Sequence, residues 1–315
     1  MKIKNTKKIV PIVFAVDDNY APFLGVALKS IIDNSSADNL YKIYILNTGL
    51  APINVKRINA LTKDNFEITF VDVNVELEKI RDRLFIRDYY TNTTYYRFFI
   101  PELFRGYDKI LYLDCDIVVL DDIAKLYQIE LNDNLIGAIQ EEVMSTIKVF
   151  GDYVEEGLGI SCKNYFNAGV ALLNLKQLRD FGILQKFLAM LDKYKFEVTQ
   201  DQDYLNVLCQ GRTQIIELGW NKTPFKEVAF DEEDIKLIHY KLSFKPWLYD
   251  DVLYAEYFWK YAKRTAFYKE ILKIKSGYSD ENKERDKIAY KNLMQLALDY
   301  TLNENNYKRL TERFS

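Results

Sequence analysis

The sequence has few of the features that mark secreted or membrane proteins. Only 3 of its 315 residues are cysteine, at positions 115, 162 and 209, with no paired spacing. An odd number of thiols argues against a disulfide-stabilised secreted domain. No apolar run approaches the roughly 18 residues that a membrane-spanning helix needs. The apolar run near the Lys-rich start breaks at Asp17, too early for a secretion signal. We expect a cytoplasmic protein without a transmembrane segment, and peripheral contact with the inner membrane face stays open.

Net charge is also small. The chain carries 43 Lys and Arg against 46 Asp and Glu, a formal charge of −3, so general affinity for nucleic acid is not expected. The charge is unevenly spread, because residues 260–315 contain 13 Lys or Arg and 8 Asp or Glu. That segment therefore carries +5, and the rest of the chain carries −8. The C-terminal part is thus chemically different from the rest.

Apolar residues are present in the pattern of an α/β protein. Hydrophobic residues make up 49 % of the chain, which is ordinary for a folded protein long enough to bury a sizeable core. Short apolar runs alternate with helical spacing through the first 125 residues, and this alternation indicates a doubly wound sheet. The strands are expected at 9–16, 42–46, 66–71 and 109–113, and the helices at 20–32, 53–61 and from 95 to 100.

The second half of the chain changes character near residue 252. Before that point we expect short strands at 135–139, 168–173 and 213–218, and a helix at 181–194. Beyond it we expect two or three amphipathic helices, interrupted near Ser276 and Gly277. The pattern predicts a main α/β domain over residues 1–250 and a helical C-terminal appendage over residues 251–315.

The strongest local signal is a pair of aspartates, Asp114 and Asp116, at the end of an apolar strand. Side chains at i and i+2 on a strand point to the same side, and two carboxylates there repel each other unless a cation lies between them. Hard oxygen ligands suit Mg²⁺ or Mn²⁺, and such a metal can hold a diphosphate. Ligands of doubly wound sheets bind beyond the carboxyl ends of the strands, where this pair and Asp17-Asp18 are expected. An acidic pair is also common in turns and helix caps, so a structural role stays open.

Two later residues can complete a metal and phosphate site. The aspartate pair needs a further protein ligand, and the imidazole of His239, the sole histidine, suits Mn²⁺. Lys245 follows six residues later, where Pro246 restricts the loop, and its ammonium can neutralise phosphate as a bond breaks. A structural histidine at a strand end and a solvated loop lysine are the plainer alternatives.

Two polar segments offer groups for a sugar. Asn167 can donate to a hydroxyl, and Gly169 allows close approach of the backbone. The segment Gln200-Asp-Gln-Asp203 offers amides and carboxylates. The first segment also fits a plain turn into a strand, and the second fits an acidic first turn of a helix. The residues alone leave both interpretations open.

Together and in this order, these segments resemble glycosyltransferase family 8, which includes bacterial lipopolysaccharide galactosyltransferases and glycogenin. The similarity covers residues 9–250, about three quarters of the chain, and an ordered series of matches is far more specific than any one of them. A narrower similarity, to Gram-positive enzymes that extend glycans on serine-rich surface adhesins, depends on the Lys-rich, Tyr-rich composition and the helical appendage. The matching segments are Phe14-Ala-Val-Asp-Asp-Asn-Tyr20, Thr93-Thr-Tyr-Tyr-Arg97, Tyr112-Leu-Asp-Cys-Asp116, Tyr165-Phe-Asn-Ala-Gly169, Gln200-Asp-Gln-Asp203 and the stretch from His239-Tyr240 to Lys245-Pro-Trp247.

The resemblance implies a GT-A fold, a mixed nucleotide-sugar-binding sheet flanked by helices, over residues 1–250. It implies a retaining transfer of a hexose, galactose favoured and glucose next, from a UDP-sugar to a glycan or glycoprotein acceptor. It also implies that Asp114, Asp116 and His239 bind a Mn²⁺ ion, with Mg²⁺ as the alternative. This ion is expected to bridge the diphosphate.

The same resemblance implies a role for each matching residue. Gln202, Asp201 and Lys245 are the expected catalytic residues, and Gln202 is expected to stabilise or position because an amide is a poor nucleophile. The donor-binding residues implied are Ala15, Asp17 and Asn19 for uracil and ribose, Tyr20 stacked on the base, Lys245 at the phosphates, Arg97, Asn167, Ala168, Asp201 and Gln202 facing the sugar, and Asp114 and Cys115 in the same donor site.

The sequence departs from the family pattern at two places. Lys241 and Leu242 stand where the family often has a glycine that lets the backbone approach the diphosphate. Gln140 and Glu141 stand where galactosyltransferases carry an acid that reaches the sugar. These differences leave the backbone contact and the choice between galactose and glucose open.

The sequence argues against two alternative functions. A sugar-nucleotidyltransferase typically has a Gly-rich, basic loop after its first strand, whereas residues 17–20 are acidic and lack glycine. A non-catalytic, sugar-nucleotide-binding partner subunit is disfavoured because Asp114, Asp116, His239 and Gln202 are all present. For the C-terminal segment, covering the sheet is the default expectation, and help in binding a protein acceptor is the hypothesis.

Overall fold

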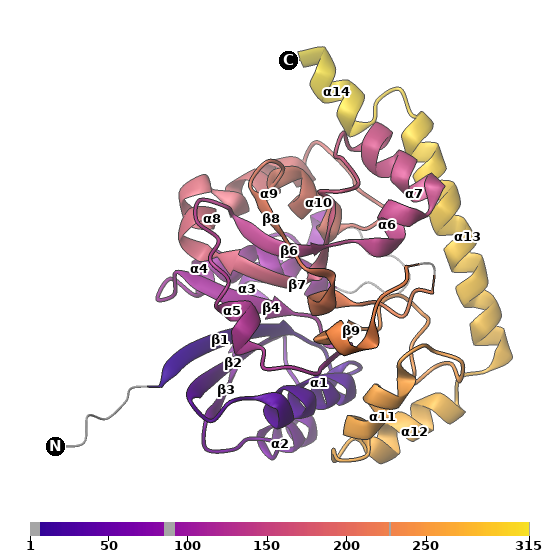
Figure 1. The fold of residues 1–315 in the computed structure, drawn as a ribbon. Helices are drawn as coiled ribbons and strands as arrows, with labels where there is room; N and C mark the ends of the chain where they lie inside the picture. Colours follow the sequence, from indigo (N-terminus) through magenta and orange to yellow (C-terminus); the bar gives the residue numbers. More distant parts are fainter. Residues whose placement is uncertain (1–6, 85–91, 227, 315) are drawn as a thin grey trace.

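The computed structural model describes residues 7–84, 92–226 and 228–314, so the basic residues 1–6 lie outside the described part. Within it, a seven-stranded mixed sheet has the order β3-β2-β1-β4-β7-β6-β8 (Figure 1). Strands β1 to β4 run parallel, and β7 runs antiparallel to β4 and β6. The expected mixed sheet flanked by helices is confirmed. The strands are β1 (Lys8–Ala15), β2 (Asn39–Asn47), β3 (Phe66–Asp72), β4 (Lys109–Leu113), β6 (Ile136–Gln140), β7 (Phe166–Asn174) and β8 (Thr213–Ile216).

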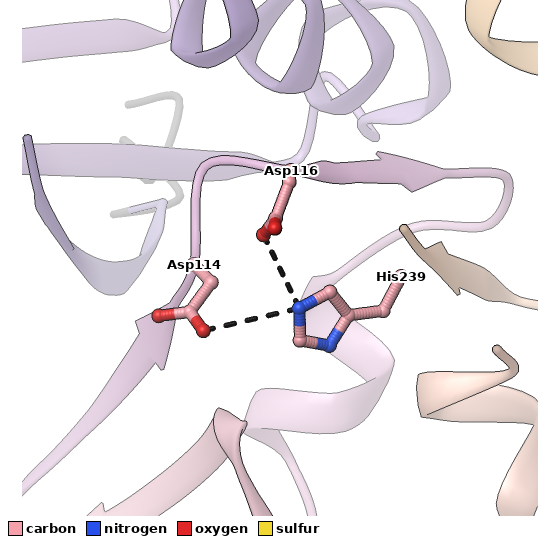
Figure 2. Close-up of side chains that lie close together, drawn as sticks. All are labelled: Asp114, Asp116 and His239. Carbon is pink, nitrogen blue, oxygen red and sulfur yellow. Dashed lines mark ion pairs between the residues drawn. The ribbon is translucent and has the colours of Figure 1, made fainter. Parts of the chain in front are cut away.

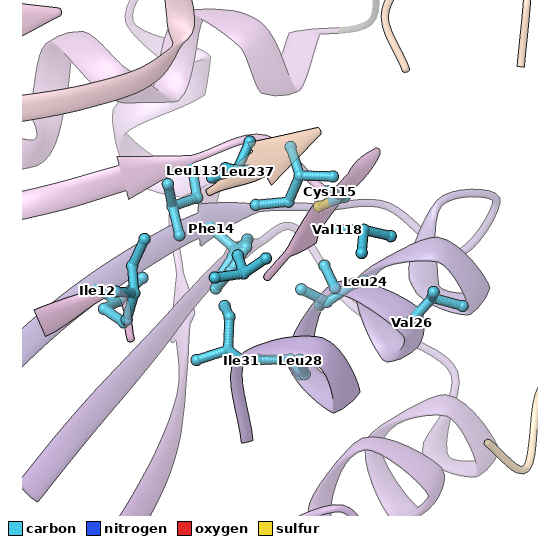
Figure 3. Packing of buried hydrophobic residues seen from close by; sticks show 14 of the residues in the cluster. Ile12, Phe14, Leu24, Val26, Leu28, Ile31, Leu113, Cys115, Val118 and Leu237 are labelled. Atoms are coloured by element: carbon cyan, nitrogen blue, oxygen red, sulfur yellow. The ribbon is translucent and has the colours of Figure 1, made fainter. Parts of the chain in front are cut away.

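Strands β1 and β4 form at the centre of the sheet because both of their faces are covered. Their near-continuous apolar runs are buried along most of their length, as is typical of parallel strands between two helical layers. Helix α1 (Ala21–Asn34) packs on one face, where Ile12 and Phe14 of β1 lie near Leu24 and Leu28 (Figure 3). Because β1 and β4 are parallel neighbours, their carboxyl ends lie side by side at one edge of the sheet.

The other helices surround this sheet, and two of them differ from the expectation. The helix expected at 181–194 is α9 (Ile183–Leu191), and a further helix that was not expected, α8 (Leu175–Phe181), precedes it; Gly182, in a left-handed conformation with φ 71°, ends α8 and separates the two. The helix expected from residue 95 is a 3-10 helix (Asn92–Phe99) that continues into α4. The further helices are α2 (Pro52–Asn59), α3 (Asn74–Glu78), α4 (Ile100–Leu103), α5 (Ala124–Tyr127), α6 (Glu142–Thr146), α7 (Lys148–Asp152), α8 (Leu175–Phe181), α9 (Ile183–Leu191) and α10 (Asp201–Leu208).

A second, two-stranded sheet joins segments that are far apart in the chain. Strand β5 (Ile117–Val119) begins directly after Asp116 and pairs antiparallel with β9 (Leu237–His239), so that Ile117 lies opposite His239. The Tyr240 amide donates to the Asp116 carbonyl at 2.8 Å. This pairing brings the end of β9 to the carboxyl end of β4.

The C-terminal segment contains four helices in its described residues, where two or three were expected. They are α11 (Ala255–Ala262), α12 (Tyr268–Ser276), α13 (Asp280–Leu302) and α14 (Tyr307–Phe314), and the expected interruption near Gly277 separates α12 from α13.

These four helices divide between two parts of the molecule. Helices α11 and α12 pack on α1, with Phe258 and Phe267 in its core cluster. Helix α13 runs away from the end of α12 along the same side of the molecule and contacts α7 and the π-helix Tyr153–Gly157 (Figure 1). Among the described residues, no helix combines the length and apolar character needed to cross a bilayer.

Candidate active site

Three side chains from the two sheets converge at the end of β4. Asp114 and Asp116 project from the connection between β4 and β5, and His239 reaches them from β9 (Figure 2). The His239 Nε2 atom lies 3.2 Å from Asp116 Oδ1 and 3.8 Å from Asp114 Oδ2. One ligand atom from each residue lies within 4.8 Å of the others. The structure thus brings together the three residues that the sequence suggested as metal ligands.

The surroundings of this triad fit a divalent cation. Two carboxylate oxygens and one imidazole nitrogen form a donor set suited to Mn²⁺ or Mg²⁺. Gly169 of β7 lies against the triad, and its carbonyl accepts from the Asp114 amide at 2.7 Å. A Cβ atom at Gly169 would lie 2.4 Å from Asp114 Oδ2 and 2.5 Å from His239 Cε1. Only glycine therefore lets β7 pass this close to the triad.

Lys245 lies on the other side of Asp116. Its ammonium contacts Asp116 Oδ2 and donates to the Tyr240 carbonyl at 2.6 Å. Burial alone would raise the pKa of Asp116, but Lys245 and His239 together hold that pKa well below its usual range. Burial lowers the pKa of Lys245, but Asp116, Tyr20 and Asp114 together raise it above its usual value. The pair is therefore a buried positive and negative charge beside the triad.

Arg97 holds the opposite wall. Its guanidinium is buried and lies 3.2 Å from Asp114 Oδ1 and 3.1 Å from Asp201 Oδ2, while it donates to the Ala168 carbonyl at 2.7 Å. One side chain thus fixes both acids. Burial raises the pKa of Asp201 to about 7 even though Arg97 opposes the shift. The Tyr112 hydroxyl, which sequence reasoning did not single out, donates to Asp114 Oδ1 at 2.8 Å.

The amide of Gln202 is held at both ends. Its Oε1 accepts from the Ala168 amide at 3.1 Å and from Asn167 Nδ2 at 3.2 Å, and its Nε2 donates to the Tyr165 hydroxyl at 3.3 Å. Gln200, two residues earlier, has φ 53° and ψ −116°, which is a strained conformation. It lies directly before α10, whose first residues are buried. This fixed geometry suits a positioning role for Gln202.

The two departures from the family pattern meet each other in the structure. The Lys241 ammonium contacts Glu141 Oε1, while Glu141 Oε2 accepts from Asn167 Nδ2 at 2.7 Å. Leu242 follows with φ 59°, which is uncommon for a residue with a side chain. Lys241 therefore places a side chain in the wall where the family often has glycine.

The end of β1 and the start of α1 form the remaining wall. Asp17 Oδ1 accepts from the Tyr20 amide at 3.0 Å, and the Cys115 thiol donates to the Ala15 carbonyl at 3.3 Å, which ties this wall to the triad. Asn19 is exposed on the turn and does not line the cavity.

One cavity of about 170 Å³ joins these walls, and every predicted site residue except Asn19 lines it. A second, larger cavity of about 560 Å³ lies beside the first and extends to α13. The two share Val143, Lys241, Leu242 and Leu293. The predicted site residues that line the first cavity are Ala15, Asp17, Tyr20, Arg97, Asp114, Cys115, Asp116, Asn167, Ala168, Asp201, Gln202, His239 and Lys245.

Asn221 belongs to the site but gave no signal in the sequence. It ends a 3-10 helix (Leu218–Asn221), is 2 % exposed, and its Oδ1 lies 2.9 Å from His239 Nδ1. No motif or periodic pattern in that irregular loop distinguishes this asparagine from a plain turn residue.

Comparison with known proteins finds relatives that match most of the chain. The sequence is 30 % identical over 261 residues to the lipopolysaccharide 1,2-glucosyltransferase of Escherichia coli K12, covering 77 % of this chain and 74 % of that protein. The crystal structure of the galactosyltransferase LgtC with donor and acceptor sugar analogues superposes with a TM-score of 0.70 and 29 % identity, over 82 % of this chain and 96 % of that one.

The apo structure of the bifunctional glycosyltransferase WbbM gives a TM-score of 0.75 and 28 % identity over 86 % of this chain. The chain spans 52 % of that longer protein. The model of the family described as "Glycosyl transferase family 8" matches residues 11–251, well over half of the sequence. The chain therefore belongs to glycosyl transferase family 8 and is a glycosyltransferase.

Proposed function

We propose that the chain transfers a hexose from a UDP-sugar to a glycan acceptor and retains the configuration at the anomeric carbon. The observation that carries this proposal is the meeting of Asp114, Asp116 and His239 at the wall of a cavity with polar side chains on its other walls. Family membership supports the reaction class. A divalent cation bound by the three residues, Mn²⁺ first and Mg²⁺ as the alternative, would supply Lewis acidity to a diphosphate.

The walls of the cavity suggest how the donor lies. The nucleoside belongs at the end of β1, where Ala15, Asp17 and Tyr20 line the cavity and Asn19 is exposed on the adjoining turn. The sugar belongs at the opposite wall, beside Arg97, Asn167 and Gln202. The diphosphate then lies between them, beside Asp114 and Asp116.

In the proposed reaction, the bond between the anomeric carbon and the phosphate oxygen breaks, and its electron pair leaves on UDP. The acceptor hydroxyl bonds to the same face of the sugar and loses its proton to the leaving diphosphate. The Lys245 ammonium, already beside Asp116, stabilises the negative charge that grows on the phosphate. Gln202 and Asp201 position the sugar, because the Gln202 amide is held at both ends and Asp201 is held by Arg97.

The acceptor belongs in the cavity that extends to α13. That cavity shares a wall with the first one, so a hydroxyl bound there can face the donor sugar. Its side chains include four aromatic rings, which offer flat apolar faces to a saccharide. Helix α13 is fixed there by Asp286, which accepts from the hydroxyls of Tyr249 and Tyr278 at 2.6 Å each. The aromatic rings are Phe225, Phe244, Tyr249 and Tyr290.

The division of the chain follows from this arrangement. We propose residues 1–250 as the GT-A catalytic domain and residues 251–315 as a helical appendage whose α13 contributes to acceptor binding, including a protein-linked glycan. Galactose is the favoured donor sugar and glucose the next, and the two named relatives transfer one or the other. The proposed location is the cytoplasm, with peripheral contact at the inner membrane face as the alternative.

The test is a donor screen. The purified protein is mixed with each UDP-sugar in turn, with Mn²⁺, with Mg²⁺ or with EDTA, and UDP release is measured. We expect release from UDP-galactose or UDP-glucose with either metal ion and none with EDTA. Equal release in EDTA would contradict the metal-assisted mechanism, and no release from any UDP-sugar would contradict the donor assignment.

A further inference from the structure

The ring of His239 is fixed by a buried amide behind it. His239 Nδ1 lies 2.9 Å from Asn221 Oδ1, and both side chains are 2 % exposed. Asn221 Nδ2 in turn lies 2.9 Å from Asn167 Oδ1. Water does not reach this side of the ring in quantity, so the partner of Nδ1 must come from the protein.

A backbone amide determines the direction of these hydrogen bonds. The Gly169 N–H can only donate, and it lies 3.0 Å from the Asn167 side chain, so the Asn167 atom that faces it is the oxygen. That oxygen can only accept, so the Asn221 atom that faces it is the nitrogen. The oxygen of Asn221 therefore faces His239, and it can only accept a proton carried by Nδ1. This deduction does not depend on an arbitrary choice of amide orientation.

The consequence concerns the other ring nitrogen. With Nδ1 committed to Asn221, Nε2 is the ring nitrogen that faces Asp114 and Asp116, and its lone pair is available to a cation bound between them. We propose that Asn221 is a positioning residue that sets the Nδ1–H tautomer of His239 and its orientation, and so prepares Nε2 to bind a divalent cation. Hydrogen-bond partners behind metal-binding histidines commonly act in this way.

The same amide chain reaches the wall assigned to the sugar. Asn167, which accepts from Asn221, also donates to Glu141 at 2.7 Å and to Gln202 at 3.2 Å. A change at Asn221 is therefore transmitted in two directions, toward the cation and toward the sugar wall. This inference rests on the proposed cation site, so its test must distinguish a failure of the role assigned to Asn221 from a failure of the cation site itself.

The test uses two variants and one probe, Mn²⁺ alone, measured by electron paramagnetic resonance without a donor. Asn221→Asp keeps an acceptor for Nδ1–H but loses the donor to Asn167 Oδ1, and Asn221→Leu loses both with the same branching, so the difference between the two variants reports the acceptor for Nδ1–H. We expect Mn²⁺ affinity within about threefold of wild type for Asn221→Asp and a loss of about 10- to 100-fold for Asn221→Leu. Equal losses in both variants would overturn the proposal, since they would indicate a purely structural role.

The single histidine allows a second measurement that needs no variant. In ¹⁵N-histidine-labelled wild type, every imidazole signal belongs to His239. We expect Nδ1 to carry a proton in the metal-free protein and in the Mg²⁺-loaded protein. A wild-type Nδ1 without a proton would overturn the proposal even if Asn221→Leu did not fold. Failure of wild type to bind Mn²⁺ would instead contradict the cation site of the proposed function, and the metal-free spectrum would still test Asn221.

Discussion

The two neighbouring cavities differ in how their walls are built. Around the triad, charged and amide side chains are buried and bonded to one another, and Arg97 alone holds two acids and a carbonyl. Around the cavity that extends to α13, aromatic and aliphatic side chains predominate, and two of them are exposed, Phe244 at 41 % and Tyr290 at 37 %. The first cavity is thus bordered by a buried polar network, and the second is the more apolar of the two.

This difference separates the part of the site that depends on a buried hydrogen-bond network from the part that depends on a partly exposed apolar surface. Buried polar groups must all be satisfied, so a change in one member disturbs its partners. A partly exposed aromatic ring has fewer hydrogen-bonding and packing partners in the protein, so its replacement affects mainly the ligand that binds against it. We therefore expect large, shared effects from changes in the first cavity and small, local effects from changes in the second.

The largest effect is expected from Asp116→Ala. It removes a carboxylate from the triad and leaves the buried Lys245 ammonium without its partner. We expect transfer below detection, a loss of at least roughly 1000-fold, because metal assistance and charge stabilisation fail together. UDP release from the preferred donor measures it. The control is Asp121→Ala, an acid paired with Lys125 at the surface, and measurable transfer by Asp116→Ala would argue against the triad as the reactive centre.

The next effect concerns the pH dependence of stability. The pKa of Asp201 is raised to about 7 by burial, against roughly 3.9 in an unfolded chain. The folded protein therefore keeps a proton that the unfolded chain loses between about pH 4 and 7, and the stability contributed by this group falls as the pH rises through that window. Asp201→Asn cannot ionise and should lose less stability over the same range, by roughly 2 to 4 kcal/mol.

Chemical denaturation of the metal-free protein at several pH values measures that difference. The surface acid Asp180, paired with Lys176, provides the control variant Asp180→Asn, which should follow wild type. Parallel curves for wild type and Asp201→Asn would mean that Arg97 keeps the Asp201 carboxylate ionised throughout the range.

A smaller effect is expected from Gly169→Ala. The added methyl would overlap Asp114 Oδ2 and His239 Cε1, so the triad must spread. We expect Mn²⁺ affinity to fall about 10- to 100-fold while the fold survives. Gly106→Ala is the matched control, because nothing lies within 4 Å of a Cβ there. Unchanged Mn²⁺ affinity in a folded Gly169→Ala protein would mean that the triad tolerates the added atom or does not bind the ion.

The polar cavity was largely predictable from the sequence, for a physical reason. Asp114 and Asp116 follow an apolar strand, and parallel strands place their carboxyl ends at one edge, so local pattern gives position. Convergence with His239 depends on the pairing of β5 with β9, more than a hundred residues apart in the chain. No local pattern encodes that pairing, and only the order of the motifs and the family resemblance suggested it.

Other parts could not be predicted at all. Asn221 is defined by hydrogen bonds to side chains from β7 and β9, and its own loop has no periodic pattern. The left-handed Gly182 between α8 and α9 and the 3-10 helix before α4 are backbone details that apolar spacing does not encode. The C-terminal segment was predicted to be helical, but amphipathic spacing alone does not indicate that α13 would border a second cavity.

The smallest effect is expected in that second cavity and best distinguishes it from the first. Tyr290 of α13 lines the cavity, whereas Ile288, two residues earlier, is 50 % exposed and does not. Tyr290→Ala should raise the KM for a glycan acceptor about fivefold, roughly 1 kcal/mol, because a flat binding face is lost. It should leave UDP release by donor hydrolysis unchanged, and Ile288→Ala should change neither.

Measuring both reactions on the same preparations separates the outcomes. If hydrolysis falls together with transfer in Tyr290→Ala, the ring supports the donor cavity through its contact with Phe150, and the two cavities form one unit. If neither reaction changes, the acceptor binds elsewhere. A rise in acceptor KM alone would mean that a helix outside the family-matched residues 11–251 selects the acceptor, while the buried network beside it performs the transfer.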